Sequence, residues 1–286
     1  MSTAGNRVKT ARSPSKGNRK KGSLFTGTIP FLLTCWKVNL AGAMEFRMSF
    51  FMTAGMMFLN NMIWMFFWSL FFNRFPTVNG WQLQDVMLMW AVGTAGFGWT
   101  SVLLGNYNRI AAIAASGQLD VYLTQPKPVL LHVLASRMSL TAIGDFLFGL
   151  CIYAFVGDFS PGGLLRFALG VLIAGLIFLF FNLGAGSLAF YIGNAEGLSF
   201  QLFNSFIMLT TYPTDIFKGF ARIILFTAVP AGFISYMPIG LLRGAQPGFV
   251  YGSLIALIFL AVSSLLLFHR GLRRYSSGNL TGMRSG

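Results

Sequence analysis

Long apolar segments occupy most of this chain and leave it few ways to fold. Of its 286 residues, 55% are hydrophobic and only 10% are charged, whereas a soluble domain carries roughly 25% charged residues. A run of about 20 apolar residues can cross the hydrocarbon core of a bilayer as a helix. Because no water is present there to bind exposed backbone groups, such a run must satisfy its own hydrogen bonds. The sequence therefore predicts an all-α integral membrane protein.

Six segments are expected to cross the membrane. They cover residues 49–72, 86–104, 129–156, 164–192, 198–211 and 249–268. Residues 216–248 are also apolar, but prolines, glycines and basic residues divide them into pieces of about a dozen residues, which are too short to span. We expect them to form a re-entrant or interfacial hairpin before the last span. Six spans place the basic residues 269–274 on the same side as the basic N-terminus, as the positive-inside rule favours.

The two ends of the chain are more polar than its middle. Residues 1–23 are rich in Lys, Arg, Ser and Gly, which predicts a disordered cytoplasmic tail. Residues 28–47 mix apolar and polar side chains, as a helix lying in the membrane interface does, and this elbow helix would enter the first span. The membrane domain is expected to cover residues 24–272, followed by a cytoplasmic tail over residues 273–286. The net charge of +14 does not indicate nucleic-acid binding, because the basic residues flank apolar segments, where membrane topology places them.

One polar insertion, residues 106–128, separates the second and third spans. Larger side chains recur from Tyr107 to Leu123 at a roughly helical period, which predicts an amphipathic helix. Gly117 interrupts this helix, and the prolines at 126 and 128 end it because proline lacks a backbone donor. The insertion is therefore predicted to be a short helix, a glycine hinge and a second helical turn at the membrane surface. It is either a plain interfacial helix or a docking element for a soluble partner.

A few polar and small residues stand out within the spans. Asp145 lies near mid-membrane, where a carboxylate indicates either a functional site or a hydrogen-bonded packing residue. Asn60 and Asn61 interrupt the first span, and interhelical hydrogen bonding is favoured over contact with a substrate. Small residues of the second span, including Gly96 and Gly98, are expected to let helix backbones approach closely.

No motif in the sequence supports catalysis. There is no nucleophile elbow, no His and Cys cluster with metal-ligand spacing and no pair of carboxylates. Cys35 and Cys151 lie far apart in apolar surroundings, as packed thiols do. The chain is thus predicted to be no enzyme, with no catalytic, metal or cofactor-binding residues of its own. Energy for transport would come from an ion gradient or from a separate ATPase.

Together these features resemble the permease subunits of bacterial type-2 ABC exporters, an ABC-2 family of transporters in which the ATP-binding protein is a separate chain. The resemblance covers nearly all of the chain after residue 23, from the elbow helix to the broken hairpin before the last span. Two stretches are more specific: SGQLDVYLTQP at 116–126 and YPTDIF at 212–217. The second is followed by further stretches that resemble the same family, at 223–225, 229–231 and 236–238.

The resemblance implies a role for each of these stretches. Residues 109–120 would form a cytoplasmic coupling helix seated in a cleft of the ATPase, and the coupling residues would be Arg109, Gly117, Gln118, Asp120 and Tyr122. The hairpin would cap the outer exit, and the pathway or gate residues would be Asp145, Tyr212, Pro213, Asp215, Pro230 and Pro238. Closure of two ATPases would then rock the membrane halves between inward-facing and outward-facing states.

The resemblance also implies partners and a location. The chain would pair with a second permease, either a copy of itself or a related chain, and with ATP-binding subunits that hold ATP and Mg. Membrane lipid would surround this multi-pass protein in the bacterial inner membrane, with both termini cytoplasmic. Export is favoured as the direction on resemblance alone.

Two other classes of active protein compete with a permease, and a third alternative, a structural scaffold, gives no reason for the broken hairpin. An ion-coupled secondary transporter would use Asp145 as its coupling carboxylate, but such proteins usually have more spans and repeated halves. A membrane-embedded enzyme would gather catalytic groups at one depth, whereas Asp120, Asp158 and Glu196 lie at different depths from Asp145. The sequence does not identify the substrate, because apolar walls that suit a lipid-like cargo are also typical of lipid-facing helices.

Overall fold

A computed structural model describes residues 24–192 and 195–275, and within these ranges the regular elements are helices joined by turns and loops, with one isolated bridge between Val78 and Trp81. The predicted N-terminal tail and most of the C-terminal tail lie outside the described residues. The longer helices are α1 (Leu24–Glu45), α2 (Arg47–Arg74), α3 (Leu83–Leu103), α7 (Thr141–Val156), α8 (Pro161–Ser187), α9 (Glu196–Thr210) and α12 (Pro247–Leu272). The shorter elements are α4 (Ile110–Ala115), α5 (Leu119–Leu123), α6 (Val129–Ala135), η1 (Leu188–Phe190), η2 (Thr214–Ile216), α10 (Phe220–Phe226), α11 (Ala231–Ser235) and the π-helical turn η3 (Pro238–Leu242).

Four of the described helices are long and apolar enough to cross a membrane: α2, α3, α8 extended through η1, and α12. They correspond to the first, second, fourth and sixth expected spans. The other two expected spans match shorter helices, since α7 has 16 residues and α9 has 15. At 1.5 Å per residue these helices are about 24 Å and about 22 Å long, below the roughly 30 Å of the hydrocarbon core. The expected all-α membrane fold is confirmed, with four helices of spanning length.

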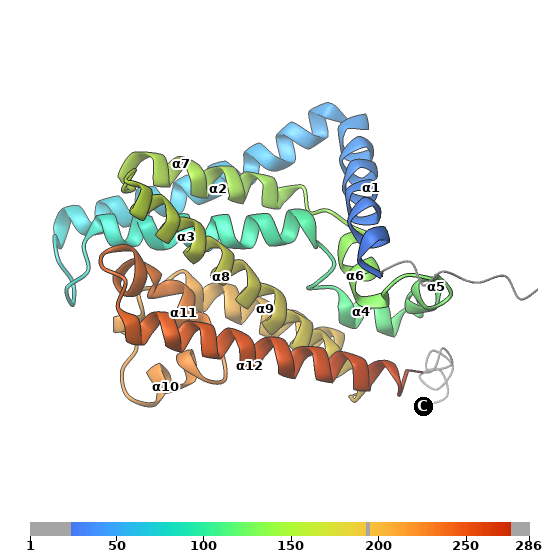
Figure 1. The fold of residues 1–286 in the computed structure, drawn as a ribbon. Helices are drawn as coiled ribbons and strands as arrows, with labels where there is room; N and C mark the ends of the chain where they lie inside the picture. Colours follow the sequence, from blue (N-terminus) through green and yellow to red (C-terminus); the bar gives the residue numbers. More distant parts are fainter. Residues whose placement is uncertain (1–23, 193–194, 276–286) are drawn as a thin grey trace, which may run out of the picture.

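The long helices run between two ends of the molecule (Figure 1). One end, here called the loop end, carries α4, α5 and α6, and α1 stands across it. The other, here called the hairpin end, carries the turns between α2 and α3 and between α7 and α8, together with α10. Residues 216–248 form only short pieces, of which α10 is the longest with seven residues. These pieces agree with the broken hairpin expected from the sequence.

The elbow segment is a helix that is held to the loop end by two hydrogen bonds. Helix α1 begins at Leu24, before the expected start at residue 28. Its Trp36 Nε1 donates to the Leu103 carbonyl at 2.8 Å, and its Asn39 Nδ2 donates to the Ala135 carbonyl at 3.1 Å. These bonds fix α1 to the C-terminal end of α3 and to α6.

Helix α3 is packed against α7 and α8 through glycines. A Cβ atom added to Gly98 would lie 2.6 Å from the backbone nitrogen of Phe146 in α7, and one added to Gly96 would lie 2.8 Å from Ala174 Cβ in α8. Real Cβ atoms essentially never approach neighbours so closely. The close backbone approach expected from the small residues of the second span is therefore confirmed.

The third expected span is not one continuous helix, so the prediction for residues 129–156 was wrong. The chain is helical in α6, leaves the helix at residues 136–140 and resumes in α7. Backbone groups in this break pair with the end of α3: Gly105 N donates to the Arg137 carbonyl at 3.0 Å and Ser139 N donates to the Ser101 carbonyl at 3.0 Å. Gly105 permits this approach, because a Cβ there would lie 2.7 Å from the Arg137 carbonyl oxygen. Arg137 is thus an exposed residue of the break rather than part of a helix.

Candidate functional site

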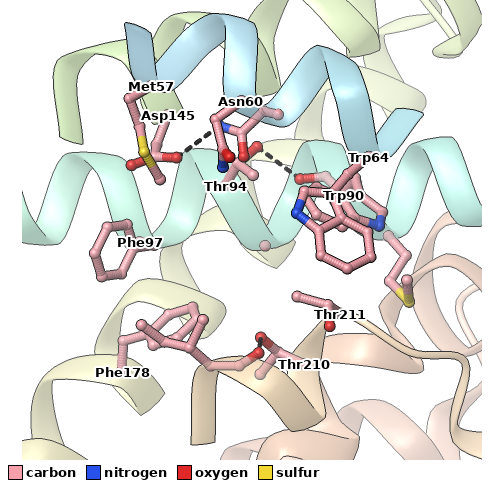
Figure 2. Close-up of a pocket in the computed structure, with 14 residues that line it drawn as sticks. Met57, Asn60, Trp64, Trp90, Thr94, Phe97, Asp145, Phe178, Thr210 and Thr211 are labelled. Atoms are coloured by element: carbon pink, nitrogen blue, oxygen red, sulfur yellow. Dashed lines mark hydrogen bonds between the residues drawn. The ribbon is translucent and has the colours of Figure 1, made fainter. Parts of the chain in front are cut away.

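A cavity of about 180 Å³ lies among α2, α3, α7, α8 and α9 and opens to the surface beside the exposed Asn60 and Trp64 of α2. Figure 2 shows its lining: Met57, Asn60 and Trp64 come from α2, Trp90, Thr94 and Phe97 from α3, and Asp145 from α7. Phe178 of α8 and the adjacent Thr210 and Thr211 from the end of α9 line the opposite side. Most of the lining is apolar, as in small-molecule sites, where a few polar groups set the orientation of a ligand.

Among the described residues, Asp145 is the one charged residue that lines this cavity. Its side chain is only 3% exposed. Asn61 Nδ2 donates to Asp145 Oδ1 at 2.7 Å, which confirms for Asn61, though not for Asn60, the interhelical hydrogen bond expected of the asparagine pair. The second oxygen, Oδ2, has no hydrogen-bond partner among the described residues, and none of the ion pairs formed there includes Asp145. The carboxylate is therefore buried, positioned by Asn61 and half unsatisfied, which is costly in a protein interior.

Two tryptophans stack beside the polar groups of the cavity. The rings of Trp64 and Trp90 have centroids 6.0 Å apart and planes 27° apart. Trp90 Nε1 is buried and has no hydrogen-bond partner among the described residues. Thr94 Oγ1 donates to the Trp90 carbonyl at 2.7 Å, so its hydrogen is used within its own helix and its oxygen remains an acceptor. The walls of the cavity thus contain aromatic faces, a buried indole N–H and a buried carboxylate oxygen, and these two polar atoms lack a hydrogen-bond partner among the described residues.

The polar insertion at the loop end forms two short helices on either side of a glycine. Helix α4 ends before Gly117, whose φ of +74° suits glycine, and α5 follows. The buried side chains Ile110, Ile113 and Leu119 pack against α8 and α12 through a cluster that includes Leu183 and Phe268. A Cβ at Gly186 of α8 would lie 2.9 Å from Ile110 Cβ, so α4 is seated directly on that helix.

The opposite face of this insertion is open. Gln118 and Val121 are exposed, the latter by 61%, while Arg109 and Asp120 are partly buried. Tyr122 is also partly buried, and its hydroxyl lies 3.0 Å from Ser136 Oγ in the break after α6. The five predicted coupling residues therefore lie on one loop. One face of this loop is exposed, and the other is apolar and packs against the long helices.

The end of α12 reaches the same loop through Tyr275. Its ring centroid lies 6.2 Å from that of Phe190. Burial, together with the nearby Asp120 carboxylate, raises the pKa of Tyr275 to about 12, so its hydroxyl remains protonated at neutral pH. The hydroxyl lies near Asp120 but has no partner of hydrogen-bond geometry among the described residues. The loop, α8 and the end of α12 thus form one packed unit.

The predicted gate residues lie at the hairpin end, apart from the cavity. Asp215 Oδ2 accepts from Trp81 Nε1 at 2.7 Å, and Asp215 Oδ1 pairs with Arg222 at 3.1 Å. Tyr212 packs edge-on against Trp68, with ring centroids 6.3 Å apart. The prolines Pro213, Pro230 and Pro238 are buried. The structure therefore places Asp215 beside Trp81 of the turn between α2 and α3 and Tyr212 beside Trp68 of α2, whereas Asp145 belongs to the separate cavity.

A second ionic group at the hairpin end was not predicted from the sequence. Asp85, only 1% exposed, pairs with Arg243 of the hairpin and accepts from Gln82 N at 2.8 Å. The spacing of Gln82 and Asp85 is that of a helix capping box, the only local sign of this site. Nearby, Arg166 donates to the Leu242 carbonyl at 3.1 Å and pairs with Asp158 at 3.3 Å. Hydrogen bonds from Ser160, with a smaller contribution from Arg166, lower the pKa of Asp158.

Removing Arg243 is expected to destabilise the hairpin end. Arg243→Gln would leave the Asp85 carboxylate buried without its cation, and breaking a buried pair in this way costs about 3–5 kcal/mol. The half-exposed Arg243 end reduces that cost toward about 2 kcal/mol. Arg222→Gln is the matched control, because the Arg222 and Asp215 side chains are 49% and 23% exposed and such pairs contribute about 0–1 kcal/mol. Heat-denaturation midpoints of the two variants in detergent would test this, and equal midpoints would contradict it.

The tryptophans and threonines of the cavity were also missed by sequence reasoning, since nothing local marks Trp64 or Trp90 as neighbours of Asp145. Among the described residues, no group of three His, Cys, Asp or Glu side chains is placed to hold a metal ion.

Comparison with known proteins connects this architecture to one family. Neither curated proteins nor solved structures gave a match to the chain. The family model described as ABC-2 family transporter protein matches residues 58–279, which is well over half of the chain. That range includes the cavity helices α3, α7, α8 and α9, the loop between α3 and α7, the hairpin and α12. The chain belongs to the ABC-2 family of transporter proteins, and it is a multi-pass membrane subunit of an ABC transporter.

Proposed function

We propose that this chain forms the translocation pathway of an ATP-driven exporter in the bacterial inner membrane and that a separate ATPase drives it through the loop of α4 and α5. The loop is the observation that carries the proposal. It is a compact element at one end of the bundle, with Ile110 and Leu119 packed onto the long helices while Val121 remains 61% exposed. An element held in this way can transmit a displacement by a soluble partner to α8 and α12, because packed elements move together.

Six crossings are proposed, with both termini on the cytoplasmic side. The helices α2, α3, α8 and α12 supply four crossings by length alone. Helix α7 begins beside the break that pairs with the end of α3, and α9 begins beside η1 at the loop end and ends against α11. Each of these two helices therefore passes between the two ends of the bundle. Short crossings can be accommodated by thinning of the bilayer and by flanking segments.

A second permease chain, either a copy of this one or a related one, is proposed to cover α2. The exposed face of that helix includes Asn60, which makes no hydrogen bond to the described part of the chain. An amide left unpaired in lipid costs free energy, whereas polar side chains hydrogen-bond readily across helix interfaces. Asn60 also lines the cavity, so a partner there would complete the wall of the pathway. Membrane lipid would cover the remaining apolar faces.

In this proposal the chain itself holds neither ATP nor Mg, which would be bound by the partner. The coupling residues are Arg109, Gly117, Gln118, Asp120 and Tyr122. The outer gate would consist of Tyr212, Asp215 and the hairpin prolines, tied to the turn after α2 by the hydrogen bond from Trp81 to Asp215. Closure of two ATPases would shift the two loops and alter the packing around the cavity. Binding energy can change the state of the permease only if these contacts differ between states.

The alternative is an ion-coupled secondary transporter, and the unpaired oxygen of Asp145 is the observation in its favour. One experiment separates the two. The chain is purified together with the ATPase encoded beside it, and ATP hydrolysis is measured with and without the permease in lipid nanodiscs. We expect co-purification and stimulated hydrolysis. A chain that binds no ATPase, yet drives transport on an imposed proton or sodium gradient that is lost in Asp145→Asn, would establish the alternative.

A further inference from the structure

We propose that the cavity of Asp145 binds a small organic cation, an ammonium group carried on an aromatic ring, and that such cations are the class of substrate transported. This inference rests on the proposed transport function, whose substrate the family match does not identify. It is carried by the buried carboxylate oxygen that lacks a partner, by the stacked tryptophans and by the size of the cavity.

The charge of the cavity determines the sign of the charge that a ligand should carry. Asp145 is its one charged lining residue, and the ion pairs among the described residues lie elsewhere, at the hairpin end. Asn61 donates to Oδ1 at 2.7 Å, and the buried Oδ2 has no hydrogen-bond partner among the described residues. An ammonium N–H donated to Oδ2 would supply both the missing hydrogen bond and the missing positive charge. Charge-assisted bonds of this kind are roughly twice as strong as neutral ones.

The aromatic lining selects the body of the ligand. Trp64 and Trp90 stack at the polar side of the cavity, and Phe97 and Phe178 close another wall (Figure 2). Aromatic faces attract cations by about 0.5–2 kcal/mol and pack well against other rings. An anion would instead place a negative charge beside Asp145.

The volume limits the size of the bound group. A cavity of about 150 Å³ lined by apolar side chains holds one benzene, and this one measures about 180 Å³. It therefore takes a single ring together with a methylene and an amine. The ligand can extend past the exposed Asn60 and Trp64, so larger amphiphilic cations could be held here by one ring and their charged group.

The test uses a matched pair of ligands on the full chain in lipid nanodiscs without any ATPase. The probe is 4-fluorobenzylamine, which is protonated at pH 7, and its neutral counterpart is 1-ethyl-4-fluorobenzene, in which a methyl group replaces the ammonium. Binding is followed by ¹⁹F NMR line broadening, with empty nanodiscs as the reference for partition into lipid. We expect the ammonium compound to bind at least about 10-fold more tightly than the neutral one after this correction.

Three variants assign the binding to the cavity. Asp145→Asn keeps an oxygen for Asn61 but removes the charge, so binding of the ammonium compound should weaken by about 30-fold or more. Asp145→Glu retains the charge and should retain most of the binding. Asp158→Asn removes an exposed carboxylate at the hairpin end, with the same change in net charge, and should have no effect.

Three results would overturn the inference: no binding beyond that of empty nanodiscs, equal binding of the two ligands, or unchanged binding in Asp145→Asn while Asp158→Asn behaves like the wild type. None of them bears on the ATPase partnership, because no ATPase is present. Conversely, a chain that binds the ammonium compound but co-purifies with no ATPase would retain the site and lose the proposed function.

Discussion

Replacing Gly98 by alanine should lower the heat-denaturation midpoint of this protein by about 6–12 °C, although the change adds a single methyl group. The new Cβ would lie 2.6 Å from both the nitrogen and the Cβ of Phe146 and 2.7 Å from its Cα. Because two of these three contacts are with backbone, a rotamer change cannot relieve the overlap, and α3 and α7 must move apart. Overpacking of this kind costs about 1–3 kcal/mol or more, and about 1 kcal/mol shifts the midpoint by roughly 2–4 °C for 150–250 residues.

Gly93→Ala is the matched control for this prediction. It makes the same substitution in the same helix, but the nearest atom to its Cβ is Ile234 Cγ2 at 3.9 Å, an ordinary contact. Alanine is also a better helix former than glycine by about 1 kcal/mol. The midpoint of Gly93→Ala should therefore equal or exceed that of the wild type. If Gly98→Ala and Gly93→Ala have the same denaturation midpoint when measured at the same scan rate, the packing described for α3 and α7 is wrong.

The cavity would be altered by the same change. Phe146 directly follows Asp145 in α7, so a shift of α7 away from α3 also moves the carboxylate relative to Asn61 in α2. Gly144 strengthens this coupling, because a Cβ there would lie 2.1 Å from the Ala54 carbonyl oxygen of α2. The position of Asp145 is thus set by close backbone contacts on both sides of its helix. We infer that the glycines serve the site as well as the fold.

Much of the architecture could be predicted from the sequence because it depends on local pattern. Apolar runs predict the helices α2, α3, α8 and α12, and the glycine at position 117 predicts the break between α4 and α5. The break between α6 and α7 could not be predicted. No proline or glycine lies within residues 136–140, and the break is stabilised by backbone hydrogen bonds to Ser101 and Gly105, residues that are distant in sequence.

The candidate site shows the same division between local and distant signals. Asp145 stands out in any reading, since an intramembrane carboxylate is rare, and Asn61 was expected to bond across helices. The pairing of Trp64 with Trp90, and the approach of Thr210 and Thr211 from α9, depend on how five helices pack. The Asp85 and Arg243 pair joins residues 158 positions apart. Such contacts leave no local pattern in the sequence, because they depend on which helices pack together.

The loop of α4 and α5 gives the second large effect that we expect. Gly117 has a φ of +74°, whereas a proline ring fixes φ near −65°. In Gly117→Pro the chain must leave this conformation, and α5 then loses its place beside α4. A cost of about 3 kcal/mol changes a conformational equilibrium by about 100-fold. If the loop couples the permease to an ATPase, the stimulation of ATP hydrolysis should fall to the level of the ATPase alone.

A substitution at the same position provides the control. Asparagine tolerates positive φ better than other residues that carry a side chain, so Gly117→Asn should retain most of the stimulation.

Asp120→Arg tests the charge of the loop separately and should weaken ATPase binding if Asp120 meets basic residues of the partner. Retained binding of 4-fluorobenzylammonium would show that the membrane part of each variant is folded. Ile110, Leu119 and Tyr275 hold the loop to α8 and α12. The proline should therefore abolish the coupling between permease and ATPase while ligand binding in the cavity is retained. Hydrolysis that is stimulated equally in Gly117→Pro and Gly117→Asn would mean that the ATPase engages some other surface of the loop end.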